Sequence, residues 1–261
     1  MLEFNTLLFL LLVTLGAFIQ TLTGFAMGVV IIVGATLLDL QAIALSAAII
    51  SLISLANTMV AMRKNYKHVD TDYFRWLCCW LMPGLVAGVA LLAYLSKNHD
   101  DILRMLLGAL VVAAGILLIR KPPLHRERST QAQAASFGLL GGLFGGLFSA
   151  GGSAFGYFLY RQPIEVSVAR ATLLAVLLIS TVIRTIMISL EGQITTEVLL
   201  TVLMAFPIVV VVTEVTGRYL SFFSDVVVRK IVVALMMIAG LFLLFNSSVI
   251  SIKELKTVAG V

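Results

Sequence analysis

Long uninterrupted apolar runs restrict what this chain can fold into more than any other feature. A helix needs about 20 mostly apolar residues to cross the hydrocarbon core of a bilayer. Six windows reach that length: residues 41–62, 73–95, 101–119, 165–190, 196–217 and 226–245. Hydrophobic residues make up 61% of the sequence and charged residues 12%, against roughly 45–50% and about 25% in soluble domains. The sequence therefore predicts an integral membrane protein without a soluble domain.

These runs are continuous, whereas the strands of a transmembrane barrel alternate apolar and polar residues in segments of about 10. We therefore expect an all-α protein that crosses the membrane several times. The amino-terminal run, MLEFNTLLFLLLVTLG, opens with an acidic residue and lacks the basic start and the cleavage site of a signal peptide. We expect it to be retained.

The net charge of +5 does not indicate a nucleic-acid partner, because the cations fall in short loops beside the apolar runs. That distribution is typical of the cytoplasmic loops of membrane proteins. Cys78 and Cys79 are adjacent within an apolar run, and no further Cys or His cluster completes a metal set. We expect no metal, no cofactor and no nucleic acid, and the sequence does not indicate an oligomeric state.

A basic, proline-containing segment, RKPPLHRERSTQAQ, separates two hydrophobic halves. Each half begins with an interrupted apolar segment, and the two halves resemble each other locally. QAIALSAAII at Gln41 resembles EVSVARATLL at Glu165, with Ser46 and Thr172 at matching places. We expect a first transmembrane repeat, a cytoplasmic linker, a second repeat and a short tail: residues 1–119, 120–133, 134–246 and 247–261.

Two topologies satisfy this pattern. If each interrupted segment crosses the membrane once, the chain has eight transmembrane helices in two parallel four-helix repeats. If each dips in and returns as a broken, re-entrant hairpin, three transmembrane helices remain per half and the two repeats are inverted. With the RKNYKH stretch and the linker in the cytoplasm, the inverted arrangement keeps more Lys and Arg on the cytoplasmic side. Loop charge therefore favours inverted repeats.

The first interrupted segment is too long for one straight helix. A helix over residues 4–38 would be about 52 Å long, against a hydrocarbon core of roughly 30 Å. GAFIQTLTGFAMG offers a break at residues 20–24, and GGLFGGLFSAGGSAFG offers a second at residues 149–153. Freed backbone groups must then be enclosed by protein or water. The N–H groups that start the next half-helix suit an anion.

Discontinuous helices from two repeats commonly meet near the midplane of a transporter and form its substrate site. The residues that we expect to bind substrate at the two breaks are Gln20, Thr23, Gly24, Ser149, Gly151, Gly152 and Ser153. The alternative is that glycines merely permit close helix packing. Four glycines fit that alternative better: Gly84, Gly88, Gly141 and Gly145.

Arg184 lies well inside a predicted span, where an Arg costs at least about 2.5–3.5 kcal/mol on insertion scales. Arg170 lies on the same predicted helix, about 40° away around its axis, so both can line one face. We expect both to bind an anionic substrate. The alternatives are an ion pair with Glu214 or Glu165, or snorkelling to the interface.

Glu214 is an acidic residue deep in a late apolar run. A buried carboxyl can carry a proton, so Glu214 is a candidate for proton coupling or for an ion pair, with Arg218 one turn away. Other polar residues within the runs are candidates for pore lining: Ser46, Asn57, Thr172 and Thr181.

Taken together, these motifs resemble the TauE/SafE family of membrane proteins, known as sulfite exporters. The resemblance rests on IQTLTGFAMG, AIALS, VARAT, MPGLVAG and GLFSAGGSAFG and covers essentially the whole chain. It implies transport of small sulfur-containing or organic anions, such as sulfite or sulfonates, across a bacterial inner membrane. The chain departs from the family pattern at Ser149, Ser153 and Arg170, which leaves room for an organic anion with a second polar group.

The leading hypothesis is a secondary transporter, an exporter that works by alternating access, with a small anion and the lipid bilayer as its partners. An anion channel and a membrane subunit that organises other proteins are the alternatives. An ATP-driven pump would need a G-x-x-x-x-G-K-[ST] loop, and an intramembrane enzyme would need a cluster such as H-E-x-x-H. The sequence contains neither, so we do not expect an enzyme.

Overall fold

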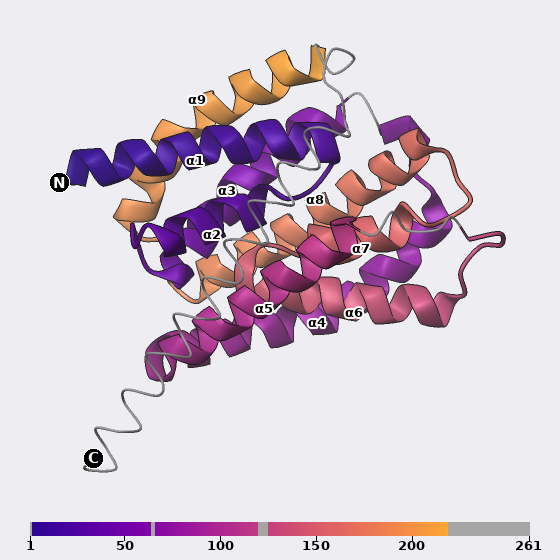
Figure 1. Cartoon of the computed structure of the whole chain (residues 1–261), viewed down its shortest axis with the longest axis horizontal. Coiled ribbons are helices and arrows are strands. Elements are labelled where there is room, and N and C mark those ends of the chain that lie inside the picture. The colour runs from indigo at the N-terminus through magenta and orange to yellow at the C-terminus, as the bar shows by residue number, and fades with distance from the viewer. Residues whose placement is uncertain (1, 64–65, 120–124, 219–261) are drawn as a thin grey trace.

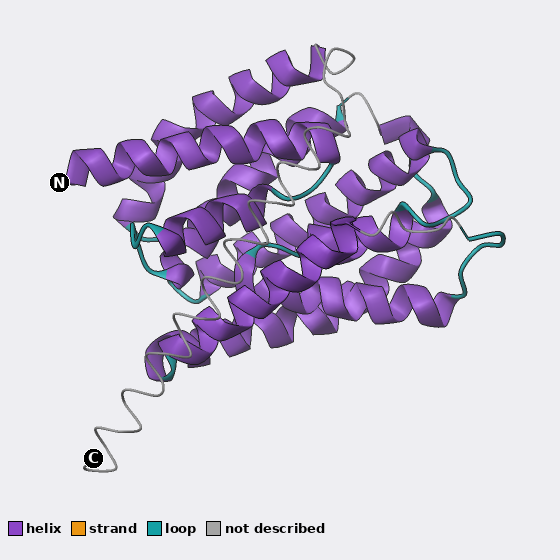
Figure 2. Ribbon diagram, in the orientation of Figure 1, coloured by secondary structure: helices purple, strands orange, loops and turns teal. Residues whose placement is uncertain are grey.

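The computed structural model describes residues 2–63, 66–119 and 125–218. All elements in this part of the chain are helices (Figures 1 and 2). They are α1 (Leu2–Thr23), α2 (Met27–Leu37), α3 (Ile43–Met62), η1 (Tyr66–His68), α4 (Thr71–Asn98), α5 (Asp100–Ile119), α6 (Gln131–Phe148), α7 (Gly152–Leu159), α8 (Val166–Leu190) and α9 (Thr196–Arg218). The predicted all-α class is confirmed for these residues.

Five described helices are long and apolar enough to cross a membrane, namely α1, α3, α4, α8 and α9. The last four coincide with windows expected from the sequence. The window at 101–119 forms α5, which carries Asp100, Asp101 and Arg104 in its first turns and does not meet the same criterion. The expected window at 226–245 and the expected tail at 247–261 lie outside the described residues.

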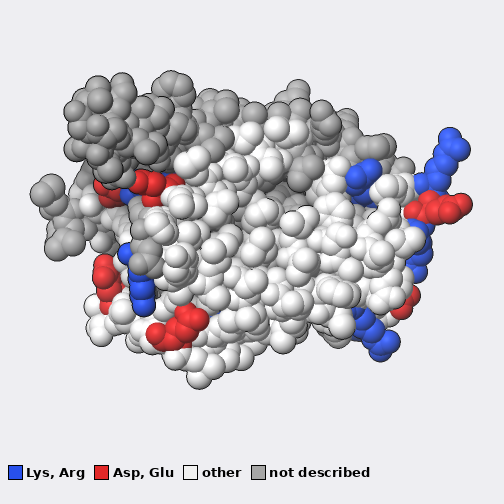
Figure 3. Space-filling model, turned by 90° about the horizontal axis from the view of Figure 1, so that it is seen from below, with Lys and Arg blue, Asp and Glu red and all other residues white. Residues whose placement is uncertain are grey.

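Charged side chains gather at the two ends of the molecule, and a broad band of uncharged side chains separates them (Figure 3). Large apolar residues are exposed on several helices, including Leu11 of α1, Val86 of α4 and Leu203 of α9. An apolar surface of this kind is stable in contact with lipid chains but not with water. The surface therefore agrees with a multi-pass membrane protein.

Helices α4 and α6 pack backbone to backbone. A Cβ added at Gly142 would lie 2.3 Å from the carbonyl oxygen of Leu81, and one added at Gly146 would lie 2.5 Å from that of Leu85. Residue numbers rise together along the contact, so the two helices run in the same direction. Gly84 and Gly88 meet carbonyl oxygens of α6 equally closely, and their predicted packing role is confirmed.

The first predicted break is confirmed between α1 and α2. Helix α1 ends at Thr23, and Gly24 follows with a φ of 85°, a conformation that glycine adopts without steric cost. Helix α2 then folds back along α1, because Gly16 lies against Ile31 and Gly34 lies against Leu12. The segment is a helical hairpin.

The second predicted break is confirmed between α6 and α7. Helix α6 ends at Phe148, and α7 begins at Gly152. Helix α7 folds back so that Phe155 covers Gly141, the packing role that the sequence favoured. The backbone N–H of Ser129 donates to Oε1 of Gln162 at 3.1 Å. The chain thus returns, after α7, to the end of the molecule where α6 began.

Candidate functional site

The two breaks touch each other inside the molecule. A Cβ added at Gly28, in the first turn of α2, would lie 2.1 Å from the carbonyl oxygen of Ser149. One added at Gly152, in the first turn of α7, would lie 2.8 Å from Cβ of Phe25. Ala26 and Ser149, one at each break, both have left-handed backbone conformations, with φ of 79° and 54°. The starts of both returning half-helices therefore meet.

A small cavity lies at this meeting point. Its volume is about 20 Å³, which is room for about one water molecule. Four predicted residues line it: Gln20, Ser149, Gly152 and Thr181. The rest of the lining consists of Phe25, Ala26, Gly28, Val29, Ser54, Thr58, Ala150 and Leu177. Of these, the sequence also favours Thr58 as a polar pore residue and Leu177 on the face shared by Arg170 and Arg184, and sequence reasoning missed the others. The hydroxyls of Ser54 and Thr58 could be identified from the sequence, because polar residues inside an apolar run are uncommon.

Arg184 of α8 is only 1% exposed and bonds to oxygen atoms from both halves of the chain. Its Nε donates to the carbonyl oxygen of Gly146 at 3.1 Å, and its Nη1 donates to that of Ala47 at 2.7 Å and to the hydroxyl of Ser51. Gly146 lies in the last turn of α6, where carbonyl groups carry partial negative charge. These oxygens offset the cost of burying the guanidinium group.

One nitrogen of Arg184, Nη2, is buried without a hydrogen-bond partner among the described residues. The other two nitrogens are bonded as above, and the Ser51 hydroxyl lies 2.8 Å from the hydroxyl of Ser149 at the cavity. Arg184 does not line the cavity, but Ser51 connects it to a residue that does. Arg184 is thus a cation with unused hydrogen-bonding capacity at Nη2, and it is linked to the second break through Ser51.

The acidic partners considered for Arg184 bond elsewhere. Oε1 of Glu214 lies 3.1 Å from Nε of Arg218, and the Glu165 carboxylate accepts from Ser167 at 3.2 Å. Arg218 is 67% exposed. Of the two roles considered for Glu214, the structure contains the ion pair with Arg218.

Arg170 has a similar place at the first break. Its Nη2 donates to the carbonyl oxygen of Thr21, in the last turn of α1, and its Nε is buried without a partner among the described residues. Its side chain also lies against Gly24. Arg170 does not line the cavity. Arg170 and Arg184 each hold the carbonyl end of a half-helix that precedes a break.

Gln20 belongs to a chain of polar contacts that joins three helices. Its Nε2 donates to Oδ1 of Asn57 at 2.6 Å, and Nδ2 of Asn57 donates to the hydroxyl of Thr213 at 2.6 Å. All three side chains are buried. The structure therefore brings Asn57 to the site with Gln20, and it adds Thr213 of α9, which sequence reasoning missed.

The remaining predicted residues lie beside the cavity or away from it. The Thr23 hydroxyl donates to the carbonyl oxygen of Ile19 at 2.8 Å, and the Ser153 hydroxyl donates to the carbonyl oxygen of Ala150 at 3.2 Å. Gly151 packs against Gly141. These contacts shape the breaks. Two other residues were candidates for pore lining but lie outside the cavity lining: Ser46, which is fully buried, and Thr172.

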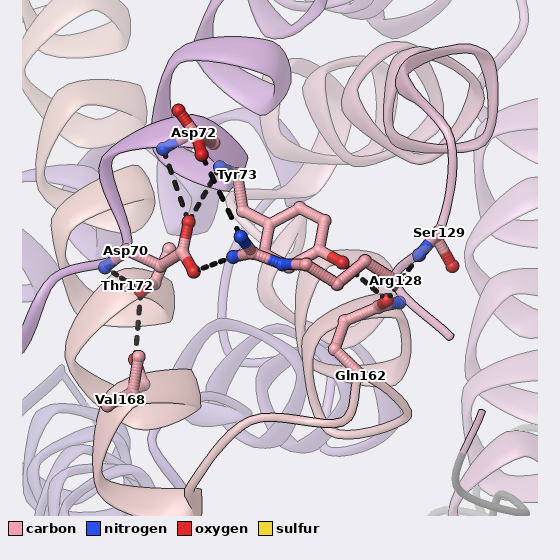
Figure 4. Close-up of polar contacts among 8 residues, drawn as sticks. All are labelled: Asp70, Asp72, Tyr73, Arg128, Ser129, Gln162, Val168 and Thr172. Carbon is pink, nitrogen blue, oxygen red and sulfur yellow. Dashed lines mark hydrogen bonds and ion pairs between the residues drawn. The ribbon is translucent and has the colours of Figure 1, made fainter. Parts of the chain in front are cut away.

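Thr172 belongs instead to a cluster at the end of the molecule where the linker lies (Figure 4). Arg128 bonds to the Asp70 carboxylate and lies 4.8 Å from the ring centroid of Tyr73. The Tyr73 hydroxyl donates to Oε1 of Gln162 at 2.8 Å, and the Asp70 N–H donates to Thr172 at 2.9 Å. Burial lowers the pKa of Arg128, but the carboxylates of Asp70 and Asp72, with Tyr73, raise it overall above its usual value. Sequence reasoning missed this cluster.

Within the described ranges, no group of three or more His, Cys, Asp or Glu residues could hold a metal ion. The geometry of the breaks instead offers backbone N–H groups, hydroxyls and a cation. Such groups can bind an anion reversibly through hydrogen bonds. They do not include a nucleophile with an adjacent base.

Comparison with known proteins gives matches over most of the chain. The family described as "Sulfite exporter TauE/SafE" matches residues 8–243. The "Probable sulfite/organosulfonate exporter TauE" of Cupriavidus necator is 30% identical over 216 residues, which are 83% of this chain and 84% of the relative. No solved structure matches the chain.

Proposed function

The chain belongs to the sulfite exporter TauE/SafE family, and we propose that it is a secondary transporter that exports a small sulfur-containing or organic anion. Sulfite and sulfonates are the substrates that its relative's name suggests. The observation that carries this proposal is the contact of two broken helices at a cavity beside Arg184. Transporters with discontinuous helices hold their substrates at such positions.

The anion binds where the half-helices α2 and α7 begin. Their first N–H groups have no partner within the helix, and the positive ends of both helix dipoles point toward the cavity. Gln20 and Ser149 supply side-chain donors, and Arg184 supplies the counter-charge through Nη2. Thr181 also lines the cavity.

Transport proceeds by alternating access. The cavity of about 20 Å³ holds one water, so an anion larger than water enters only when the two breaks separate. The described structure is therefore a closed arrangement of the site. The small volume of the cavity supports a site that admits the anion only after such a rearrangement.

The two halves are inverted repeats, each a broken hairpin followed by transmembrane helices. The contact between Ser129 and Gln162 supports this arrangement, because it closes the second hairpin on its own side. The folding of α2 along α1 supports it for the first half. The repeats comprise residues 1–119 and 134–246, and the linker at 120–133 joins them.

The protein lies in the inner membrane of a bacterium, with its linker in the cytoplasm. The cations at the linker end support this orientation. Arg128 lies beside the start of α4, and the Arg161 carbonyl accepts from the His125 N–H at 2.8 Å. Both therefore lie at one end with Lys67 and His68 of η1, as the positive-inside pattern requires of cytoplasmic loops.

Counterflow of radiolabelled sulfite into proteoliposomes tests the proposal with the purified protein alone. We expect saturable counterflow that falls about tenfold or more in Arg184→Ala, as loss of about 1.4 kcal/mol of binding implies, and that also falls in Gln20→Ala. Arg75→Ala is the matched control, since Arg75 is exposed near the start of α4. Size-exclusion profiles report folding of each variant. Normal counterflow in folded Arg184→Ala and Gln20→Ala would contradict the site.

A further inference from the structure

A second and much larger cavity opens at the end of the molecule opposite the linker. Its volume is about 540 Å³, within the range of roughly 300–1,000 Å³ typical of ligand pockets. Lys97, which lines it, lies in the last turn of α4, whereas Asp70 caps the first turn of the same helix. At 1.5 Å per residue the two ends of α4 are about 40 Å apart. The cavity therefore lies far from the Arg128 cluster.

The lining of this cavity combines apolar and polar residues. Ala44, Ala48 and Ala93 are among the small apolar residues that line it. Ser96, Lys97, Glu191 and Gln193 bring hydrogen-bonding and charged groups to the same space. Pockets that bind small molecules combine apolar walls with a few convergent polar groups in this way.

The cavity reaches toward Arg184. Ala48 lines it, and the neighbouring Ala47 carries the carbonyl oxygen that accepts from Nη1 of Arg184. Glu191, which also lines the cavity, caps the carboxyl end of α8, the helix that carries Arg184. The cavity and Arg184 thus contact successive residues of α3.

The two ends of the molecule differ in access. At the linker end, the Arg128 cluster joins α4, α7 and α8 through Asp70, Gln162 and Thr172. At the other end, the cavity of about 540 Å³ is open to the outside of the molecule. Between them, the cavity at the breaks has space for about one water. The large cavity has space for a sulfonate, whereas the cavity at the breaks does not.

We propose that this cavity is the exit vestibule of the transporter, a separate binding site for a sulfonate or a similar small oxyanion. This inference rests on the proposed function. Lys97 provides the attracting charge, and Ser96 and Gln193 provide hydrogen-bond donors. Glu191 opposes the anion and keeps its binding weak, because a site on a conduction path has to release its ligand as well as attract it.

Cysteine protection tests the vestibule directly. Ala93→Cys is made in a Cys78→Ala/Cys79→Ala background, reconstituted in proteoliposomes and treated with a membrane-impermeant maleimide. Ethanesulfonate is the protecting anion, because sulfite itself consumes the maleimide. His99→Cys is the matched control, since His99 is exposed just after α4, at the same end of the molecule, but does not line the cavity. We expect ethanesulfonate, but not chloride at equal ionic strength, to slow modification of Ala93→Cys only.

Substitutions of charged lining residues test whether protection depends on charge in the expected direction. We expect the ethanesulfonate concentration for half-protection to rise about threefold in Lys97→Met and to fall about threefold in Glu191→Gln, as exposed charge pairs imply. Lys97→Arg is expected to restore protection. Glu197→Gln, which removes an exposed carboxylate outside the lining, is expected to change nothing. The vestibule would be overturned if ethanesulfonate gave no protection, if chloride protected equally well, or if protection did not depend on Lys97.

Sulfite counterflow in the same background, without the added cysteine, separates the two proposals. Counterflow without protection would overturn the vestibule and leave the proposed function intact. Protection that depends on Lys97, without counterflow, would support the anion site and contradict transport.

Discussion

At the scale of single residues, the contact between Gly28 and Ser149 decides how closely the two breaks approach. The space for a Cβ at Gly28 is occupied by a carbonyl oxygen of the other half of the chain. Backbone atoms cannot turn away as the end of a flexible side chain can. Any side chain at Gly28 therefore has to push α2 and the second break apart.

We expect Gly28→Ala to lower the free energy of unfolding by about 1–3 kcal/mol, the usual cost of overpacking. Gly217→Ala is the matched control, because a Cβ at Gly217 meets no atom within 4 Å and alanine favours a helix by up to about 1 kcal/mol. Thermal unfolding in detergent measures both. Equal effects of the two substitutions would show that the contact at Gly28 is absent.

Sequence reasoning identified Arg184 as a buried charge but could not identify its partners. Hydropathy placed the residue inside a span, and the energetic cost of a membrane-buried Arg required compensation. Besides the Ser51 hydroxyl, the partners are carbonyl groups of Ala47 and Gly146, which are 137 and 38 residues away. Every residue has a carbonyl group, so no residue type marks these positions. The acidic residues that do stand out in the sequence bond elsewhere.

At the scale of elements, the Arg128 cluster fastens the linker to the start of α4 and to the end of the second hairpin. Asp70 has two roles there. Its Oδ1 caps α4 by accepting from the N–H groups of Asp72 and Tyr73, and its Oδ2 binds Arg128. Substitutions that separate these roles measure each of them.

We expect Asp70→Asn to keep the helix cap and lose the ion pair, at a cost of at most about 1 kcal/mol of stability. Asp70→Ala also loses the cap and costs about 1 kcal/mol more. Arg128→Gln is expected to match Asp70→Asn, and the double variant to be less destabilised than the sum of the two. Thermal unfolding at low salt measures all four, and strict additivity would refute the pairing.

The positions of the breaks were predictable, but the path of the chain after them was less so. Length alone required a break between residues 4 and 38, and glycine with polar neighbours marked Gly24 and Ser149. Whether each segment crosses or returns depended on loop charge, which is a weaker signal. The contact that closes the second hairpin, between Ser129 and Gln162, joins two polar residues of ordinary loop composition, so the sequence offered no sign of it.

At the scale of the whole molecule, charged ends and an apolar band determine how the protein lies in a bilayer (Figure 3). The band follows directly from the composition and was predictable. The assignment of loops to sides depends on where each hairpin returns. In the inverted topology, the residues just before and just after the second hairpin lie on the same side of the membrane. In the parallel topology, they lie on opposite sides.

We expect Arg126→Cys and Glu165→Cys, both exposed, to be protected from an impermeant maleimide in intact cells and modified after permeabilisation. His99→Cys, at the opposite end of α5, is expected to be modified in intact cells. The background is Cys78→Ala/Cys79→Ala. Modification of Arg126→Cys and Glu165→Cys from opposite sides would contradict inverted repeats and favour parallel ones.

The left-handed residues at the two breaks bear on the energetics of the proposed transport cycle. Ala26 and Ser149 are not glycines, yet both have positive φ, which costs about 1–3 kcal/mol each. The closed arrangement therefore contains backbone energy that a rearrangement of either residue recovers. This backbone energy offsets part of the packing energy that is lost when the breaks separate. Under the proposed alternating access, the free-energy difference between closed and open arrangements is then smaller than the contacts between the hairpins suggest, which raises the population of the open arrangement.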